Sequence, residues 1–266
     1  MEQSSAQAAA STYTQASMYY LDTVTAQDAA QRLKQKSYAL LAARAGDALL
    51  DAGCGTGDDV RALARLVGPT GRVIGIDFRE DVIAEAQRRS ATDTNTTFEV
   101  ADIYQLPFAE ATFDGCRAER VFIHLLDPRQ ALTELIRVTR PGGQIVVMDP
   151  DWDTLAIATP DVAISRTLTH LICDNTRQGQ MGRQLYGLFQ AAGLQEVTIL
   201  ADTVVLTDFA VAAEIFHLRT LVELAQQQEL LTAETAAGWL ASLEGADRAG
   251  QFFSAITGFM ASGRKP

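Results

Sequence analysis

A glycine-rich segment that follows the apolar run at 48–50 most constrains the fold of this chain. Its glycines stand at every second position, Gly53, Gly55 and Gly57, and a helical pattern comes next. Glycine allows a sharp turn and a close approach of the backbone to a ligand, and such a loop between a strand and a helix is typical of nucleotide-binding α/β sheets. A tight strand–helix turn without a ligand is the alternative, and the loop alone does not decide between them.

Strands and helical segments alternate after this loop. Further strands are predicted at 72–77, 97–100, 113–119 and 144–148, with helical patterns between most of them. Helices of this length between strands imply parallel pairing through right-handed crossovers. The sequence therefore predicts an α/β fold with a doubly wound, Rossmann-like and mostly parallel sheet.

The two ends of the chain add helices to this plan. An amphipathic helix is expected over 26–44, and we interpret residues 1–45 as an N-terminal helical cap region before a main domain at 46–266. A long helical stretch at about 208–249 is predicted to be an insertion before the last strand. That strand, within 251–264, is expected to be antiparallel.

Composition narrows the choice of partners. The formal net charge of −11 argues against nucleic acid as a partner, because surfaces that follow phosphates cluster Lys and Arg. The start of the chain has neither a basic segment nor an apolar core, and no apolar run is long enough to cross a bilayer, so we expect neither a secretory signal nor an integral membrane protein. The cysteines show no metal-ligand spacing, and no metal site is predicted. We expect a cytoplasmic protein, and its oligomeric state stays open.

The charges of the glycine loop separate two kinds of cofactor. A dinucleotide-binding fingerprint has its third glycine one residue later, where this chain has Asp58. A carboxylate there, with Asp51 and Asp59 nearby, would repel a pyrophosphate but attract a ligand that carries an ammonium and a sulfonium. Asp77, twenty residues after Gly57, ends the second strand and suits ribose hydroxyls in either case. The loop therefore favours S-adenosylmethionine over NAD.

The order of the motifs resembles that of the class I S-adenosylmethionine-dependent methyltransferases, in particular the small-molecule group that includes the ubiquinone and menaquinone methyltransferases. The motifs lie between Leu49 and Met148 in the family's order and approximate spacing. They are the segments 51–57, 73–77, 101–102 with 106–108, 113–114 and 137–143. The resemblance becomes thin after Asp149, where acceptor specificity usually resides.

This resemblance implies a set of cofactor-binding residues. At the methionine end they are Asp51, Gly53, Gly55 and Gly57, and at the ribose Asp77. At the adenine they are Phe78, Asp102 and the Ile103 backbone, and the residues that close over the cofactor are Glu119 and Arg120. Two of these have a plainer alternative. Asp102 can be a turn-forming residue, and Phe78 can pack in the core.

Candidates for the acceptor side lie near the carboxyl ends of the strands. His124 follows the fourth strand and suits a general base, although a histidine satisfied by local backbone is the alternative. Past the fifth strand, Asp151 could orient an acceptor and Trp152 could form a wall of the acceptor pocket. The alternative is that these residues belong to a surface loop that one aromatic side chain anchors. Tyr19 is a further pocket candidate, and the N-terminal tyrosines together with residues 208–245 are candidates for a lid.

These features predict methyl transfer from S-adenosylmethionine to a small-molecule acceptor by in-line displacement, with S-adenosylhomocysteine as product. The nucleophile can be oxygen, nitrogen or carbon. The family likeness makes a quinone-like acceptor one candidate, and a secondary metabolite is another. Two alternatives stay open: a non-methylating S-adenosylmethionine-binding protein on the same fold, and an NAD-dependent oxidoreductase, against which the loop argues.

Overall fold

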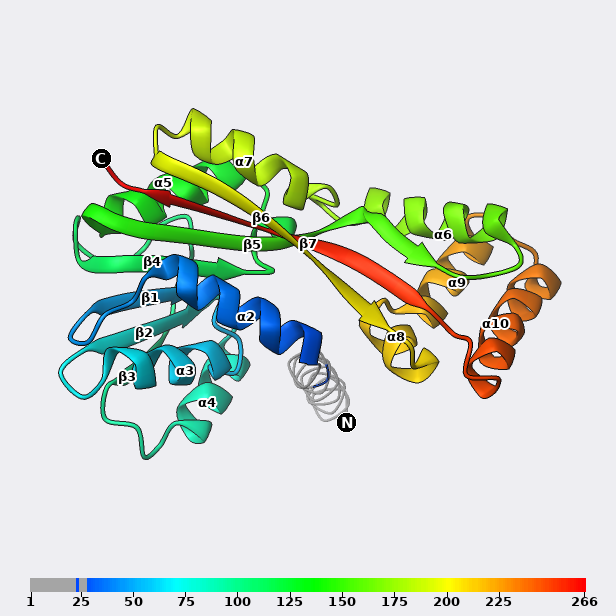
Figure 1. The fold of residues 1–266 in the computed structure, drawn as a ribbon, viewed down its shortest axis with the longest axis horizontal. Helices are drawn as coiled ribbons and strands as arrows, with labels where there is room; N and C mark the ends of the chain where they lie inside the picture. The colour runs from blue at the N-terminus through cyan, green and yellow to red at the C-terminus, as the bar shows by residue number, and fades with distance from the viewer. Residues whose placement is uncertain (1–22, 24–27) are drawn as a thin grey trace, which may run out of the picture.

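The computed structural model describes residue 23 and residues 28–266, and a seven-stranded sheet forms the centre of that part (Figure 1). The strands are β1 (Ala48–Ala52), β2 (Arg72–Asp77), β3 (Thr96–Val100), β4 (Phe113–Glu119), β5 (Thr139–Ile157), β6 (Gln195–Leu206) and β7 (Ser254–Arg264). Their order across the sheet is β3-β2-β1-β4-β5-β7-β6. Strands β1 to β5 pair in parallel, whereas β7 is antiparallel to β5 and β6. The predicted mostly parallel α/β sheet with an antiparallel last strand is confirmed.

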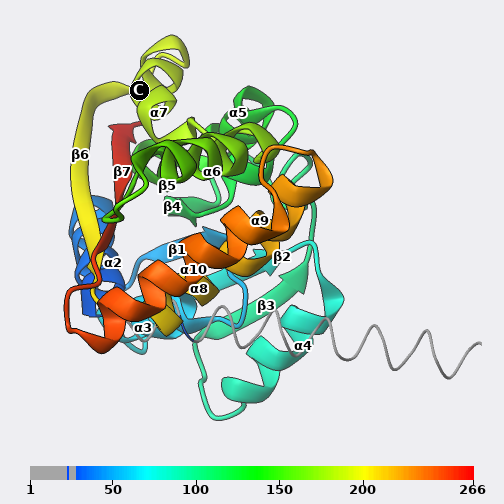
Figure 2. The ribbon, with the colours of Figure 1, turned by 90° about the vertical axis from the view of Figure 1, so that its right-hand side faces the viewer.

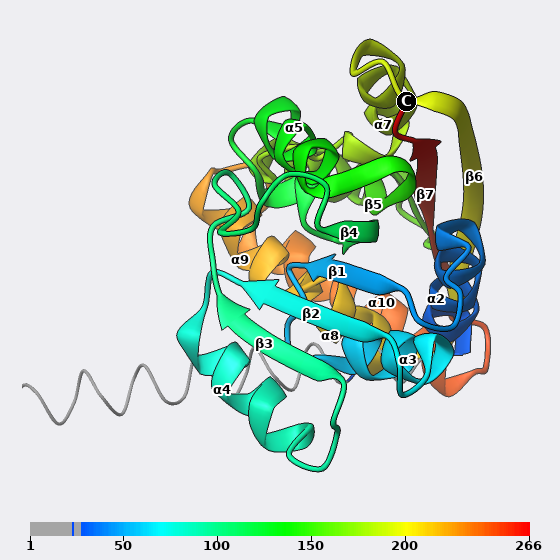
Figure 3. The same ribbon diagram turned by 90° about the vertical axis from the view of Figure 1, so that its left-hand side faces the viewer.

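Helices cover both faces of the parallel strands. They are α2 (Asp28–Leu41), α3 (Asp58–Val67), α4 (Glu80–Arg89), the 3-10 turn η1 (Phe122–His124), α5 (Pro128–Val138) and α7 (Met181–Ala191). Apolar side chains of α2, α3 and α4 share one buried cluster with β1, β2 and β3, while α5 and α7 belong to a second cluster. Figure 3 shows β3, β2, β1 and β4 side by side. Two separate apolar layers therefore hold this half of the sheet.

A further group of helices packs on the far halves of the three long strands. They are α6 (Val162–Asn175), α8 (Phe209–Ile215), α9 (Leu218–Gln227) and α10 (Ala233–Arg248), here called the helical lobe. With the ends of β5, β6 and β7 they bury an apolar cluster that includes Leu168, Phe216 and Trp239. Figure 2 shows the lobe facing the viewer, in front of the parallel strands. Because α8, α9 and α10 stand between β6 and β7, the predicted helical insertion before the last strand is confirmed.

Strand β5 is much longer than the strand predicted at 144–148. Its second half pairs with β7, so that Asp149 lies opposite Phe259 and Ala156 lies opposite Ala255. The interpretation of the residues after Met148 as a loop past the strand is therefore wrong, since they continue the sheet toward the helical lobe.

The division into a cap at 1–45 and a main domain at 46–266 stays a prediction. In the described part of the cap, α2 packs directly on the sheet, because Tyr38 and Leu41 share the buried cluster of α3. Among the described residues, no helix combines the length and the hydrophobicity needed to span a bilayer.

Candidate functional site

The glycine loop joins the end of β1 to the start of α3 through left-handed backbone. The φ angles of Gly53, Gly55 and Gly57 are 76°, 51° and 81°, a region that side chains other than glycine rarely adopt. The N–H groups of Gly53 and Cys54 both donate to the carbonyl of Ile76, at 2.7 and 2.8 Å. The loop is thus tied to the carboxyl end of β2, where open α/β sheets bind their ligands.

Asp77 lies directly against this loop. Its carboxylate accepts hydrogen bonds from the N–H of Gly55 at 3.1 Å and from the N–H of Arg79 at 3.0 Å. Burial raises the pKa of Asp77, while these two amides act in the opposite direction. The neighbouring Phe78 is 78% exposed, so the alternative that it packs in the core is wrong. A carboxylate and an exposed aromatic ring therefore stand together beside the glycine loop.

The segment after β3 meets the same edge of the sheet. The N–H of Ala101 donates to the carbonyl of Asp77 at 3.0 Å, which brings the end of β3 beside β2. Asp102 is exposed, and its carboxylate accepts from the N–H of Tyr104 at 2.9 Å, as in an Asx turn. Ile103 is 9% exposed and belongs to the core. The turn-forming role of Asp102 is thus present, and it leaves the residue open to solvent at the ligand edge.

Charged side chains from four elements meet beneath the glycine loop and form what we call the buried ion cluster. Its members are Lys34 of α2, Asp51 of β1, Asp59 of α3, and Arg117 and Glu119 of β4. Arg117 lies 3.0 Å from Asp51 and 3.4 Å from Asp59, and it also pairs with Glu119. Lys34 pairs with Asp59 and lies 3.4 Å from Glu119. The cluster fastens the N-terminal helix to the strands and the helix that carry the loop.

Two further side chains of α2 complete the surroundings of this cluster. The Nε group of Arg117 donates to the hydroxyl of Ser37 at 3.0 Å, and the hydroxyl of Tyr38 donates to Asp59. The guanidinium of Arg117 also lies 5.4 Å from the centre of the Tyr38 ring. Because Arg117 is 1% exposed, its charge depends on these partners rather than on water.

The two aspartates of the cluster titrate in opposite directions. Burial raises the pKa of Asp51 to about 7, against the attraction of Arg117, and Asp59 raises it further. Burial also acts to raise the pKa of Asp59, but Arg117 and Lys34 together bring it below its usual value. Asp59 is therefore the ionised partner of both cations, whereas Asp51 holds its proton more readily.

The sequence analysis missed Lys34 and Arg117 as residues of the site. They come from distant parts of the chain, and neither belongs to a motif. The available signal was Arg117 itself, since a charged residue within the apolar strand at 113–119 must find partners inside the protein.

The end of β4 carries three of the predicted site residues. Glu119 belongs to the buried ion cluster, and Arg120 adopts a left-handed φ of 55° with its N–H bonded to the carbonyl of Met148 at 2.7 Å. Such strained backbone gathers at functional sites. His124 follows in η1 and is exposed, and its ring forms no hydrogen bond with another described residue. Partial burial of the ring lowers the pKa of His124, and the positive charges of Arg120 and Arg177 lower it further. The imidazole is therefore neutral near pH 7.

Asp151 and Trp152 occupy different surroundings from those that the sequence suggested. Asp151 is fully buried, and its carboxylate accepts two hydrogen bonds from Arg183, one at 2.7 Å. The ring of Trp152 packs between two apolar clusters, with its centre 6.1 Å from that of Phe216 in the helical lobe. Neither residue lies on a surface loop, because both belong to β5. Asp151 therefore holds α7 against β5, and its carboxylate does not face an open site. Tyr19 lies outside the described residues.

Asp149 is a buried acid of the same strand. One carboxylate oxygen accepts from the N–H of Ile123 at 3.2 Å, and the other has no partner among the described residues. Burial raises the pKa of Asp149 well above its usual value, against the hydrogen bonds from the amides of Ile123 and Phe122. The side chain therefore holds η1, and with it His124, in place as a neutral acid.

We expect Asp149→Asn to leave the stability nearly unchanged, because an amide reproduces the neutral acid and still accepts from Ile123. Asp149→Leu removes the acceptor and should lower the free energy of unfolding by about 1–3 kcal/mol. Urea unfolding followed by circular dichroism measures both values. Equal losses in the two variants would show instead that Asp149 is ionised.

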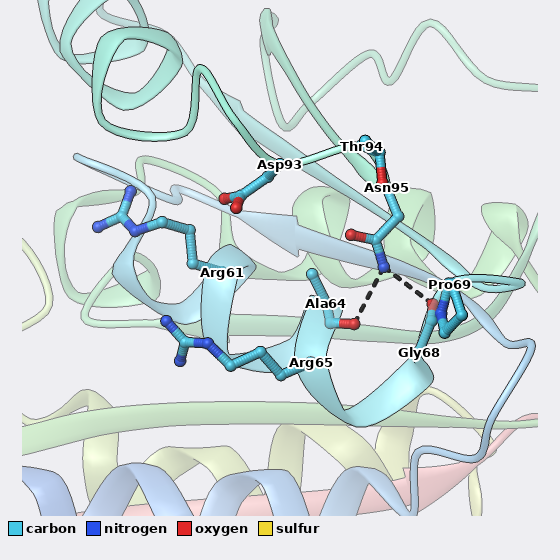
Figure 4. Close-up of a pocket in the computed structure, with 8 residues that line it drawn as sticks. All are labelled: Arg61, Ala64, Arg65, Gly68, Pro69, Asp93, Thr94 and Asn95. Atoms are coloured by element: carbon cyan, nitrogen blue, oxygen red, sulfur yellow. Dashed lines mark hydrogen bonds between the residues drawn. The ribbon is translucent and has the colours of Figure 1, made fainter.

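A surface hollow of about 360 Å³ lies away from this edge. It is lined by the end of α3 and by the residues before β3, and the amide of Asn95 donates there to the carbonyls of Ala64 and Gly68 at 3.0 and 2.9 Å (Figure 4). These bonds close the carboxyl end of α3, so Asn95 has a structural role. The hollow adjoins the start of β3, at the edge opposite the glycine loop.

The comparisons with known proteins agree with this site. A family model described as a methyltransferase domain matches residues 43–229, and the chain belongs to that family. Together with the fold, this defines the protein as a class I S-adenosylmethionine-dependent methyltransferase.

Two relatives illustrate the range of the family. An uncharacterised 37.1 kDa protein of a Streptomyces fradiae transposon is 40% identical over 239 residues, which are 90% of this chain and 68% of that protein. Demethylmenaquinone methyltransferase of Staphylococcus aureus is 37% identical over 114 residues, 43% of this chain and 47% of that enzyme. The chain thus spans about half the length of the curated methyltransferase that it matches.

Solved structures share the fold at low sequence identity. A structure from Bacillus halodurans, titled as a methyltransferase, has a TM-score of 0.59 at 16% identity and covers 88% of this chain and 98% of its own. The [4+2]-cyclase SpnF has a TM-score of 0.54 at 22% identity and covers 90% of this chain and 83% of its own. Because these titles name different reactions, the fold alone does not fix the chemistry.

Proposed function

We propose that the protein transfers the methyl group of S-adenosylmethionine to a small-molecule acceptor whose nucleophile is oxygen, nitrogen or carbon. The observation that carries the proposal is the glycine-lined edge formed by the loop at 53–57, with the carboxylate of Asp77 against the loop and the acids of the buried ion cluster beneath it. The donor set fits this cofactor, because carboxylates attract its ammonium and sulfonium whereas they would repel a pyrophosphate. When bound, the cofactor supplies a methyl group that its sulfonium already activates.

The residues of the chain have distinct parts in this proposal. The backbone at Gly53, Gly55 and Gly57 lets the methionine end approach, Asp77 accepts from the ribose hydroxyls, and the exposed Phe78 covers one side of the adenine. Asp102 and the Ile103 backbone lie on the adenine side, while Asp51, Glu119 and Arg120 close the methionine end. The main contribution of such a site is orientation, which can lower a barrier by roughly 7–11 kcal/mol in favourable cases.

His124 is the proposed base for acceptors that must lose a proton. Its ring is exposed near the end of β4, and its lowered pKa keeps the nitrogen available as a proton acceptor at neutral pH. Trp152 is the proposed wall of the acceptor pocket, since it stands where the sheet meets the helical lobe. A role of Tyr19 in this pocket and of the helical lobe as a lid belong to the same proposal.

The nature of the acceptor is also part of the proposal. The partial likeness to demethylmenaquinone methyltransferase supports a quinone-like acceptor, and a secondary metabolite is the other candidate. The net charge of −11 favours a small molecule over nucleic acid, and the three buried free cysteines favour a reducing, cytoplasmic location. The likeness to a [4+2]-cyclase keeps a non-methylating function on this fold as the second candidate.

Calorimetric titration with S-adenosylmethionine and S-adenosylhomocysteine, with NAD as the control ligand, tests the cofactor site. Asp77→Ala should weaken binding by at least about tenfold, because it removes charge-assisted hydrogen bonds. Asp93→Ala, an exposed acid beside the hollow of Figure 4, should leave the affinity unchanged.

Saturable binding of both sulfur ligands justifies a screen of quinones, phenols and amines with labelled methyl groups. Binding without turnover on any acceptor would favour the non-methylating candidate. Binding of NAD in preference to both ligands would contradict the proposed function.

A further inference from the structure

The segment between α6 and α7 is held against η1. The N–H of Gln178 donates to the carbonyl of Ile123 at 3.0 Å, and the side-chain amide of Gln178 donates to the carbonyl of Leu125 at 3.2 Å. The guanidinium of Arg177 lies 3.5 Å from the carbonyl oxygen of His124. These contacts fix Arg177 beside His124, although 53 residues separate the two in the sequence.

This pair of residues borders the edge of the sheet that carries the glycine loop. Val121 lies so close to the loop that a Cβ atom on Gly53 would be 2.2 Å from the Cγ2 atom of Val121. The 3-10 turn η1 begins at the next residue and ends at His124. His124 and Arg177 are both exposed there, on the side where the proposed function places the acceptor.

Arg177 adds a positive charge that no acid balances. It forms no ion pair with an acid among the residues that the structure describes, whereas Arg120 pairs with Glu119 at 3.5 Å. Burial lowers the pKa of His124, and the charges that add to this effect are both positive, those of Arg120 and Arg177. The local charge at this place is therefore opposite to the net charge of −11 of the whole chain, which favours a negatively charged ligand.

We propose that the acceptor is a small organic anion, whose carboxylate or phosphate group binds Arg177 and whose nucleophile lies beside His124. The inference rests on the proposed function and narrows its acceptor class. A guanidinium suits such groups, because its N–H donors match two oxygens of one carboxylate or phosphate. A bound anion also favours the protonated form of a nearby imidazole, so it makes His124 a stronger base. An uncharged acceptor would leave Arg177 without a part in binding.

Nuclear magnetic resonance of the histidine rings tests this inference, because the chain has three histidines and His124→Gln identifies the signal of His124. The complex with S-adenosylhomocysteine is titrated with benzoate, phenyl phosphate or benzamide at constant ionic strength. Benzoate or phenyl phosphate should raise the pKa of His124 in a saturable way, whereas the uncharged benzamide should not. The stronger of the two responses distinguishes a carboxylate from a phosphate. The filled cofactor site keeps the anions from binding in place of the carboxylate of the cofactor.

Two arginine variants locate the anion. Arg177→Gln should weaken binding of the anion about tenfold, because it removes a charge-assisted contact. It should also raise the pKa of His124 in the absence of any anion, since one positive charge leaves the surroundings of the ring. Arg166→Gln is the matched control, because Arg166 is an exposed arginine in the first half of α6, before the segment that contacts η1. It should leave both values unchanged.

The outcomes separate this inference from the proposed function. If S-adenosylhomocysteine bound but neither anion changed the signal of His124, the inference would be overturned and the function would stand. Equal responses in the wild-type protein and Arg177→Gln would also overturn it, since the anion would then bind elsewhere. A response to benzamide as large as that to benzoate would mean that the site selects the ring and not the charge. Absence of S-adenosylhomocysteine binding would overturn the function itself, and the acceptor role of Arg177 with it, even if benzoate still bound.

Discussion

Replacement of Arg117 by methionine is expected to lower the free energy of unfolding by roughly 3–5 kcal/mol, the usual loss when one partner of a buried ion pair is removed. Arg117 is 1% exposed and contacts Asp51, Asp59 and Glu119. Methionine fills much of the same space, but Asp51 would then lose its ion pair, and Lys34 and Arg120 would be the cations left beside Asp59 and Glu119. Urea unfolding followed by circular dichroism measures the loss.

The same substitution should become less harmful as the pH falls. In the wild-type protein the cations hold the pKa of Asp59 below its usual value, so Asp59 stabilises the fold above the pKa of the unfolded chain. Without Arg117, burial dominates and raises the pKa of these acids in the folded protein above their pKa in the unfolded chain. The acids then destabilise the fold as the pH rises above their pKa in the unfolded chain. The difference between wild type and Arg117→Met should therefore be smaller at pH 5 than at pH 8.

Arg88→Met is the control for this experiment. Arg88 forms an ion pair with Glu85 on α4, but its side chain is 71% exposed, and exposed pairs contribute little to stability. We expect little or no change of the urea midpoint at either pH. If Arg117→Met behaved like Arg88→Met, the cluster would be hydrated rather than buried.

The parts of the site that could be predicted are those written in a short stretch of sequence. Gly53, Gly55 and Gly57 are contiguous with the strand and helix that they join, and Asp77 ends a strand whose β-branched residues mark it clearly. Local patterns of this kind determine the φ angles and the edge of the sheet on which residues stand. They identified the cofactor half of the protein before any tertiary contact was known.

The parts that could not be predicted depend on pairing over long distances. Lys34 and Glu119 are 85 residues apart, and Asp151 and Arg183 are 32 residues apart, with no periodic pattern that links them. The second half of β5 contains Asp149, Pro150 and Asp151, which locally resemble a loop, and it becomes a strand because β7 pairs with it. Tertiary pairing here overrides local propensity.

Replacement of Gly53 by alanine is expected to lower the affinity for S-adenosylhomocysteine at least about tenfold and the free energy of unfolding by roughly 2–5 kcal/mol. A Cβ atom at this position would lie 2.2 Å from Cγ2 of Val121, and the φ of 76° is itself unfavourable for alanine. Either Val121 or the loop must move. Val121 precedes η1, so the shift would reach both the glycine loop and the segment that carries His124. Calorimetry and urea unfolding measure the two losses.

Two further variants separate the steric clash from the backbone strain. Gly142→Ala has nearly the same φ, 78°, but its Cβ atom would meet nothing within 4 Å, so it should show the strain alone, about 1–2 kcal/mol. In Gly53→Ala combined with Val121→Ala, the nearest remaining Val121 atom is Cβ at 3.4 Å, an ordinary contact. The double variant should therefore be more stable than Gly53→Ala, although it buries fewer methyl groups. If it were less stable, the requirement for glycine would come from the backbone angle, and the close approach of the loop to Val121 would not be what positions the cofactor edge.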